Sequence, residues 1–131
     1  MFVAKVVVIG GGWSGCAAAI SATKAGADVV LLERTDMLLG TGLVGGIMRN
    51  NGRFTATEEA IAMGGGELFQ AMDQVARHRN IEFPGHKHAN LYDVAKAEPA
   101  ARKVVRDHGV DIRMLSRATD VTLDGSQITS I

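Results

Sequence analysis

A glycine pattern near the N-terminus, Gly10-x-Gly12-x-x-Gly15, has the spacing of a phosphate-binding turn. Each glycine has its own physical role in such a turn. The first allows a sharp reversal after a strand, the second lets the backbone approach a pyrophosphate, and the third lets a helix pack close to the strand. The N–H groups that begin this helix face the phosphates with a partial positive charge. The pattern therefore indicates a dinucleotide-binding turn.

Glu33 supplies the second element of the same fingerprint. It lies 18 positions after Gly15, at the end of a predicted strand, where a carboxylate accepts hydrogen bonds from an adenosine ribose. An acid there disfavours a 2′-phosphate, so NADP is the poorest fit. We expect Ser14 to donate its hydroxyl to a phosphate oxygen, to cap the helix, or both. Trp13 is expected either to stack on the cofactor or a partner, or to cover the open side of the sheet.

The other reactive side chains form no recognisable catalytic set. Cys16 is the only cysteine and is predicted to pack against the sheet as a small apolar residue. His86-x-His88 has no acidic or cysteine ligand at metal-binding spacing, which favours a solvated loop over a metal site. Arg34 is a candidate partner for phosphates on the adenine side, although solvent exposure is the simpler interpretation. We predict no metal site and name no catalytic acid, base or nucleophile.

The elements around the turn form a βαβ unit within residues 1–34. Residues 2–9 are a short, β-branched apolar run, typical of a parallel strand buried on both faces. An alanine-rich helix is predicted over residues 14–25, with Gly26 as its stop. A second buried strand over residues 28–33 follows. Strand, glycine turn, helix and strand in this order predict an α/β fold with a Rossmann-like parallel sheet.

The next segment, residues 35–66, is predicted to be a glycine-rich loop with a short helix around residues 57–62. Thirteen of the 16 glycines lie between Gly10 and Gly66, so they are concentrated in the turn and this loop. Loops this long inside a compact domain are usually binding loops or disordered. The loop is therefore a second candidate for cofactor contact.

Residues 67–109 are predicted to be mainly helical. Apolar spacing indicates a helix over residues 67–79, followed by a polar loop over residues 80–90. Asp93 can cap a further helix that ends at Gly109, and Pro99 inside it predicts a kink or two shorter helices.

Residues 110–131 are predicted to form a strand and a small hairpin at the C-terminal end. The strand covers residues 110–115, and the hairpin strands cover residues 118–123 and 127–131. Asp124-Gly125-Ser126 is the turn that joins the hairpin strands.

The composition is that of one soluble globular domain. With 131 residues, 47% of them hydrophobic and 21% charged, the chain is too apolar for intrinsic disorder. Its formal net charge of zero argues against nucleic acid as a partner. The uncharged stretch over residues 6–23 contains four glycines, which argues against a membrane span or a signal peptide. A single cysteine fits a reducing compartment, so we expect a cytoplasmic protein.

Three segments carry a resemblance to a known family: VVVIGGGWSGCAAA at residues 6–19, VVLLER at residues 29–34 and LGTGLVGG at residues 39–46. They resemble FAD-dependent oxidoreductases of the glutathione-reductase structural class, which include the FAD-dependent pyridine nucleotide-disulfide oxidoreductases. The resemblance implies FAD as the cofactor, with its flavin side along residues 40–46 and with Gly40, Thr41 and Gly42 among the cofactor-binding residues. Two departures are Trp13-Ser14, where such families commonly have Pro-Ala, and Gly40-Thr41 in place of Gly-Gly.

The resemblance also implies an incomplete site. Flavoproteins of this class close the FAD site with a later strand that carries a Gly-Asp or Ala-Thr-Gly motif, whereas this sequence stops at Ile131. Residues 1–131 are therefore expected to be a single, apparently truncated FAD-binding domain of a larger flavoprotein, or a subunit that needs a companion. We expect the isolated chain to purify without FAD. Exposed strand edges are expected to favour association with another copy.

Two other functions stay open at this point. The chain is either an NAD-binding Rossmann module or a non-catalytic fragment that binds nothing on its own. The relative affinities for FAD and NADH separate these alternatives from the first interpretation.

Overall fold

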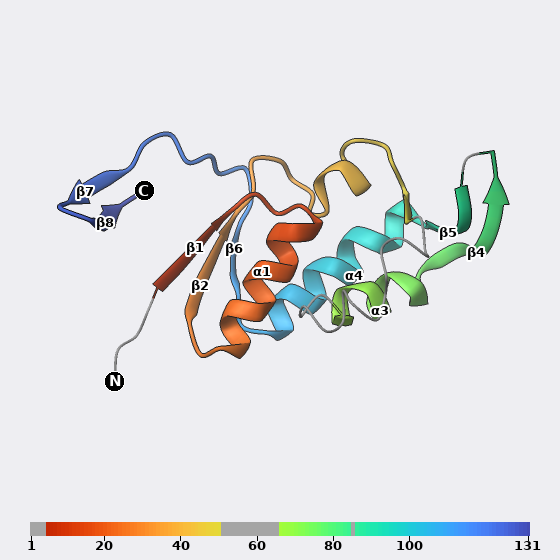
Figure 1. The fold of residues 1–131 in the computed structure, drawn as a ribbon, viewed down its shortest axis with the longest axis horizontal. Helices are drawn as coiled ribbons and strands as arrows, with labels where there is room; N and C mark the ends of the chain where they lie inside the picture. The colour runs from red at the N-terminus through yellow and green to blue at the C-terminus, as the bar shows by residue number, and fades with distance from the viewer. Residues whose placement is uncertain (1–4, 51–65, 85) are drawn as a thin grey trace.

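The computed structural model describes residues 5–50, 66–84 and 86–131. Strand β1 (Lys5–Ile9), helix α1 (Trp13–Lys24) and strand β2 (Asp28–Leu32) form the predicted βαβ unit (Figure 1). Strands β1 and β2 are parallel, with Val7 opposite Val30, and β6 (Asp111–Arg113) pairs in parallel with the other edge of β2. The predicted parallel α/β sheet is confirmed, with strand order β1-β2-β6.

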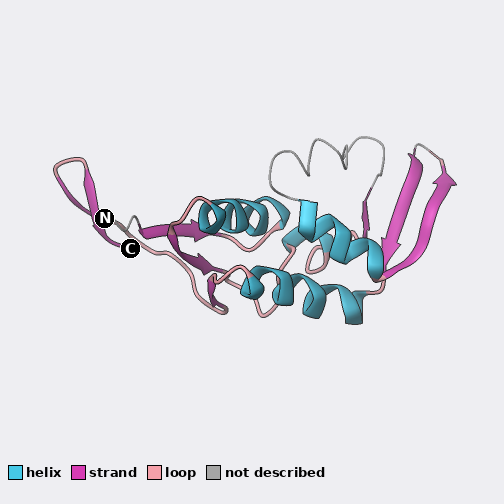
Figure 2. Ribbon diagram, turned by 90° about the horizontal axis from the view of Figure 1, so that it is seen from below, coloured by secondary structure: helices cyan, strands magenta, loops and turns pink. Residues whose placement is uncertain are grey.

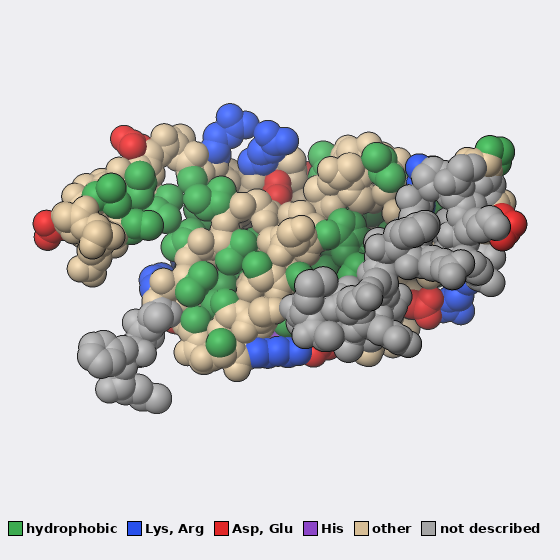
Figure 3. All heavy atoms as spheres, viewed as in Figure 1, with side chains coloured by type: hydrophobic (Ala, Val, Ile, Leu, Met, Phe, Trp, Pro, Cys, Tyr) green, Lys and Arg blue, Asp and Glu red, His purple; other side chains and the backbone are tan. Residues whose placement is uncertain are grey.

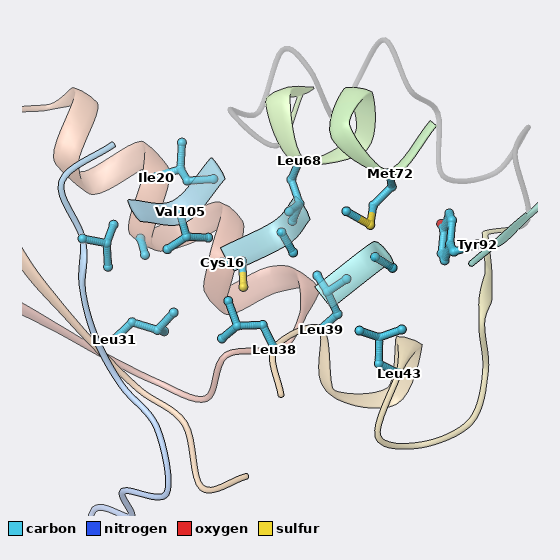
Figure 4. Packing of buried hydrophobic residues seen from close by; sticks show 14 of the residues in the cluster. Cys16, Ile20, Leu31, Leu38, Leu39, Leu43, Leu68, Met72, Tyr92 and Val105 are labelled. Atoms are coloured by element: carbon cyan, nitrogen blue, oxygen red, sulfur yellow. The ribbon is translucent and has the colours of Figure 1, made fainter. Parts of the chain in front are cut away.

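One face of this sheet carries the buried core. Val29 and Leu31 of β2 are buried, whereas the intervening Val30 is half-buried, as expected when successive side chains of a strand point to opposite faces. Ile20 of α1 and Val105 of α4 (Val94–Asp107) belong to the same buried cluster (Figure 4). Helix α3 (Gly66–Gln74) packs against α4. The helices therefore seal the sheet on the side of Val29 and Leu31.

Helix α4 begins and ends where the sequence predicts. Asp93 is its N-cap, and its carboxylate accepts the N–H of Ala95 at 3.1 Å. Gly109 follows the C-terminus with a positive φ of 81°, a conformation that suits glycine. The helix is continuous through Pro99, so the expected division into two shorter helices is wrong. Proline removes only the hydrogen bond to the carbonyl of Ala95, and the buried face of the helix on both sides of Pro99 holds it together.

The expectations for residues 67–90 are partly wrong. Helix α3 ends at Gln74, and the predicted polar loop is an antiparallel hairpin of β4 (Ala76–Phe83) and β5 (His86–Tyr92), with β3 (Arg49–Asn50) on the other edge of β5. Figure 2 shows this hairpin extending away from the helices. A ribbon that packs on little else needs no alternating apolar pattern, which explains why the polar sequence gave no strand signal. The short helix predicted around residues 57–62 lies outside the described residues.

The C-terminal hairpin is confirmed, with shorter strands than predicted. Strands β7 (Thr122–Asp124) and β8 (Gln127–Ser130) are antiparallel, and Gly125 in the turn has a φ of 59°. Ile128 lines a cavity together with Val7 and Val30 on the sheet face opposite the core. Figure 3 shows exposed hydrophobic side chains on this part of the molecule. Within the described residues, no helix has the length and apolarity that crossing a membrane requires.

Candidate functional site

The turn between β1 and α1 has the geometry that its glycines predict. Gly10 has a φ of 99°, which a residue with a side chain rarely adopts, and its N–H donates to the carbonyl of Leu32 at 2.8 Å. A Cβ on Gly15 would lie 1.8 Å from the carbonyl oxygen of Gly10 and 3.5 Å from Cγ1 of Val8. Gly10 therefore makes the reversal, and Gly15 brings helix α1 against the turn.

Gly12 is different, because it borders open space. It is the N-cap of α1 with a φ of −66°, and a Cβ built on it would meet no atom of the described residues within 4 Å. Among the same residues no side chain caps this helix, and its first turn contains no acidic residue. The N-terminal end of α1 therefore keeps its partial positive charge, and a pyrophosphate has room beside Gly12.

Glu33 lies at this turn, where the ribose assignment requires it. Glu33 is 5% exposed; its Oε2 accepts the N–H of Gly11 at 2.7 Å, and its Oε1 accepts the N–H and the hydroxyl of Thr35 at 2.8 and 2.9 Å. Burial raises the pKa of Glu33, but the hydrogen bonds from Thr35 and Gly11 together lower it below its ordinary value. Each carboxylate oxygen can accept about two hydrogen bonds, so Oε2, which accepts one from Gly11, has the capacity for a second.

Gly11 is a structurally constrained residue of the turn that the fingerprint does not single out. Besides its N–H bond to Glu33, its carbonyl accepts the N–H of Leu39 at 2.8 Å. A Cβ on Gly11 would lie 2.6 Å from Cδ2 of Leu38 and 3.2 Å from Cβ of Glu33. The run of three consecutive glycines is the sequence signal that could have identified it.

The second glycine loop (residues 39–46) lies directly against the turn through Leu39 and Gly40. Gly40 starts a short 3-10 helix (Gly40–Gly42), and a Cβ on Gly40 would lie 3.3 Å from Cα of Gly12. Gly42 is buried, whereas Thr41 is exposed. The structure therefore brings Gly40 to the phosphate turn, and the predicted contact of residues 40–42 with the flavin stays a prediction.

Trp13 packs its ring within the protein. The indole stacks on Phe69 with centroids 5.1 Å apart and is tilted against Tyr92 at 5.7 Å. A Cβ on Gly42 would lie only 2.4 Å from its Nε1. The ring thus joins α1 to α3 and to the second glycine loop. A contact of Trp13 with the cofactor stays a prediction.

Ser14 and Arg34 are both exposed. Gly12, rather than Ser14, is the N-cap, so the hydroxyl of Ser14 does not cap the helix. The charge of Arg34 contributes to the lowered pKa of Glu33. Contacts of either side chain with phosphate stay predictions.

Cys16 is buried behind the turn. Its thiol donates to the carbonyl of Gly11 at 3.2 Å, and burial is the main cause that raises its pKa to about 12. The thiol is therefore protonated at neutral pH and is a poor nucleophile. Within the described residues, no group of three or more histidine, cysteine or acidic side chains is arranged to hold a metal ion.

Comparison with known proteins gives one family and a set of structural neighbours. A family model described as FAD dependent oxidoreductase matches residues 5–131. No curated protein sequence matches the chain.

The solved structures that resemble the chain share its fold at low sequence identity. The Diels-Alderase PyrE3 from pyrroindomycin biosynthesis is 21% identical with a TM-score of 0.63, over 95% of this chain and 28% of that one. The p-nitrophenol 4-monooxygenase PnpA from Pseudomonas putida is 18% identical with a TM-score of 0.63, over 96% and 35%. A 2-methyl-3-hydroxypyridine-5-carboxylic acid oxygenase is 22% identical with a TM-score of 0.58, over 90% and 33%. The chain thus spans about a third of the length of these proteins.

Proposed function

This chain belongs to the family of FAD-dependent oxidoreductases, and from that membership we propose that residues 10–15 hold the FAD pyrophosphate and that Glu33 holds the adenosine ribose. The chain is an FAD-binding segment of a flavin-dependent oxidoreductase, with FAD as its cofactor. The space beside Gly12, at the uncapped start of α1, is the observation that supports this placement most directly. The carboxylate of Glu33 is anchored to the same turn through Gly11.

The residues of this chain bind and orient the cofactor in this proposal. Bound FAD supplies the redox chemistry, which the isoalloxazine ring carries out by accepting and donating electrons. The backbone of the first turn of α1 stabilises the two phosphate charges. Glu33 stays ionised at neutral pH because its pKa is lowered, so it is an acceptor for a ribose hydroxyl.

Within the family, we propose the glutathione-reductase-like class that the fingerprint resembles. The support is the βαβ unit with Glu33 bonded to the glycine turn. Disulfide chemistry would need cysteines other than Cys16, which is buried and protonated. An oxygenase is the second candidate, because two of the neighbours reported above are named a monooxygenase and an oxygenase.

The remaining parts of the active site are proposed to come from a larger flavoprotein or a companion subunit. The support is the share of the neighbours that this chain covers, about a third of their length. An NAD-binding module and a fragment that is empty on its own stay as the alternatives. A cytoplasmic location is proposed from the single unpaired cysteine.

Substitution of Gly12 by alanine tests the placement of the pyrophosphate. The new methyl group contacts no atom of the described residues, and a φ of −66° suits alanine, which favours the fold by about 0.4–1 kcal/mol. Alanine is a poorer N-cap than glycine, which opposes this gain, so the free energy of unfolding is expected to change by less than about 1 kcal/mol. The same methyl group occupies the space assigned to the pyrophosphate, and FAD affinity is expected to fall at least about tenfold, or by about 1.4 kcal/mol. Urea unfolding and FAD titration measure the two effects separately.

The control for this experiment is Gly109→Ala, a change at the glycine that follows α4, outside the turn and the glycine-rich loop. Gly109 has a φ of 81°, so alanine there is strained and costs stability, but FAD affinity is expected to be unchanged. If Gly12→Ala bound FAD as tightly as the original chain, the pyrophosphate would not lie at this turn.

A further inference from the structure

Two side chains of helix α4 hold the segment that leads from β2 to the second glycine loop. Oε1 of Glu98 accepts the N–H of Leu38 at 3.4 Å, and Nη2 of Arg102 donates to the carbonyl of Asp36 at 2.9 Å. The two side chains are also paired with each other, with Nε of Arg102 donating to Oε1 of Glu98 at 2.8 Å. This pair therefore connects α4 to backbone 60 and 66 positions earlier in the chain.

The acidic member of the pair is buried, whereas Arg102 is half-buried. Glu98 is 9% exposed, and it is one of two buried acidic residues in the described chain, the other being Glu33 at the turn. Such a pair adds little net stability compared with apolar residues of the same size, because the charge of Glu98 loses its hydration. Its more specific effect here is to fix the backbone at Asp36 and Leu38.

Residues 36–39, whose backbone the pair binds, pack directly against the phosphate turn. Leu38 and Leu39 are fully buried (Figure 4), the side chain of Leu38 lies over Gly11, and the N–H of Leu39 donates to the carbonyl of Gly11. Leu39 has a φ of 69°, a left-handed conformation that is unfavourable for leucine. Such a conformation persists only when surrounding interactions stabilise it. The hydrogen bonds from Glu98 and Arg102 to the backbone just before Leu39 are one such support.

We propose that Glu98 and Arg102 are positioning residues for FAD: they hold residues 36–39 against Gly11 and Gly12 and so keep the turn in its phosphate-binding form. This inference rests on the proposed function of that turn. Neither side chain touches the turn itself in the described contacts, so both act through the segment that they hold.

The test compares variants of the pair with variants of a second ion pair on the same helix. Glu98→Ala removes the hydrogen bond to Leu38, and Arg102→Ala removes the one to Asp36. Glu98→Gln keeps an amide oxygen that can still accept the N–H of Leu38. Lys103→Ala and Asp107→Ala are the controls, because Lys103 and Asp107 also form an i,i+4 pair on α4 but are exposed and hold no other segment. Alanine is a good helix former, so none of these changes weakens α4 through its helix propensity.

The first measurement is amide hydrogen exchange in the chain without FAD. The amide of Leu39 is expected to exchange about tenfold faster in Glu98→Ala and Arg102→Ala, because it reports the contact with Gly11, while amides of α1 and β2 keep their rates. Glu98→Gln is expected to lie between the alanine variants and the original chain. The two control variants are expected to exchange like the original chain at Leu39.

The second measurement is the dissociation constant for FAD. It is expected to rise about tenfold in the two alanine variants of the pair and not in the controls, as is usual for groups that act through another residue. Unchanged exchange at Leu39, or equal acceleration throughout α1 and β2, would overturn the positioning role. If Leu39 exchanges faster in the alanine variants but the original chain binds no FAD, the proposed function of the turn is wrong. The inference that Glu98 and Arg102 position residues 36–39 is then still supported.

Discussion

Replacement of Gly15 by alanine is expected to lower the free energy of unfolding by about 3 kcal/mol, because a methyl group there overlaps the backbone. Its Cβ would lie 1.8 Å from the carbonyl oxygen of Gly10 and 3.0 Å from the carbonyl carbon. The overlap is with backbone rather than with a flexible side chain, so relief requires α1 to move away from the turn. Urea or thermal unfolding measures the loss.

Helix propensity predicts the opposite sign for the same substitution. Gly15 is the third residue of α1, and alanine is favoured over glycine within a helix by about 1 kcal/mol. The matched variant is Gly12→Ala, at another glycine of the motif, where the Cβ meets no atom of the described residues. An unfolding free energy for Gly15→Ala at or above that of the original chain would contradict the packing seen at this turn.

Substitution of Glu33 by glutamine is expected to cost about 2 kcal/mol of stability, which is within the range for leaving a buried donor unsatisfied. The carboxylate accepts from three donors on its two oxygens, two from Thr35 and one from Gly11. An amide has only one oxygen, so its NH₂ group must face either Gly11 or Thr35, both of which donate. Glu82→Gln, the same chemical change at an exposed position of β4, is the control and is expected to be neutral within about 0.5 kcal/mol.

The stability difference between Glu33→Gln and the original chain is expected to depend on pH. The folded pKa of Glu33 is lowered, so its ionised form stabilises the fold fully above the unfolded pKa of about 4.5. This contribution is lost as the pH falls below that value and through the folded pKa. The two proteins are therefore expected to converge in stability under acidic conditions and to differ most near neutral pH. A difference that stays constant from pH 7 down to about pH 3 would mean that the charge of Glu33 is unimportant.

Local sequence signals predicted the parts of the fold that local interactions determine. The glycine turn, the alanine-rich helix α1, the Asp93 cap of α4 and the turn at Gly125 each depend on residues close together in the chain. The β4–β5 hairpin was missed because its strands are polar and packed mainly against each other. Pro99 was expected to kink α4 or to divide it into two shorter helices, but α4 is one helix, because its tertiary packing on both sides outweighs one lost hydrogen bond.

The candidate site was predicted in outline, and its internal contacts were not. The motif assigned roles to Gly10, Gly12 and Gly15, while Gly11 turned out to carry the bond to Glu33 and the contact with Leu38. These contacts join residues that are 22 or more positions apart. Spacing rules describe one element at a time, so they do not contain such pairings. The contact between Glu98 and Leu38, 60 positions apart, is the extreme case.

Titration of the chain with FAD and, in parallel, with NADH tests the central claim most directly. Trp13 is the only tryptophan and is the first residue of α1, so its fluorescence reports a cofactor bound at the turn. We predict saturable quenching by added FAD, with an affinity higher than that for NADH, and a loss of this quenching in Gly12→Ala. Tight binding of NADH with none of FAD would contradict the assignment in favour of an NAD-binding module. No response to either dinucleotide would show a fragment that binds neither on its own.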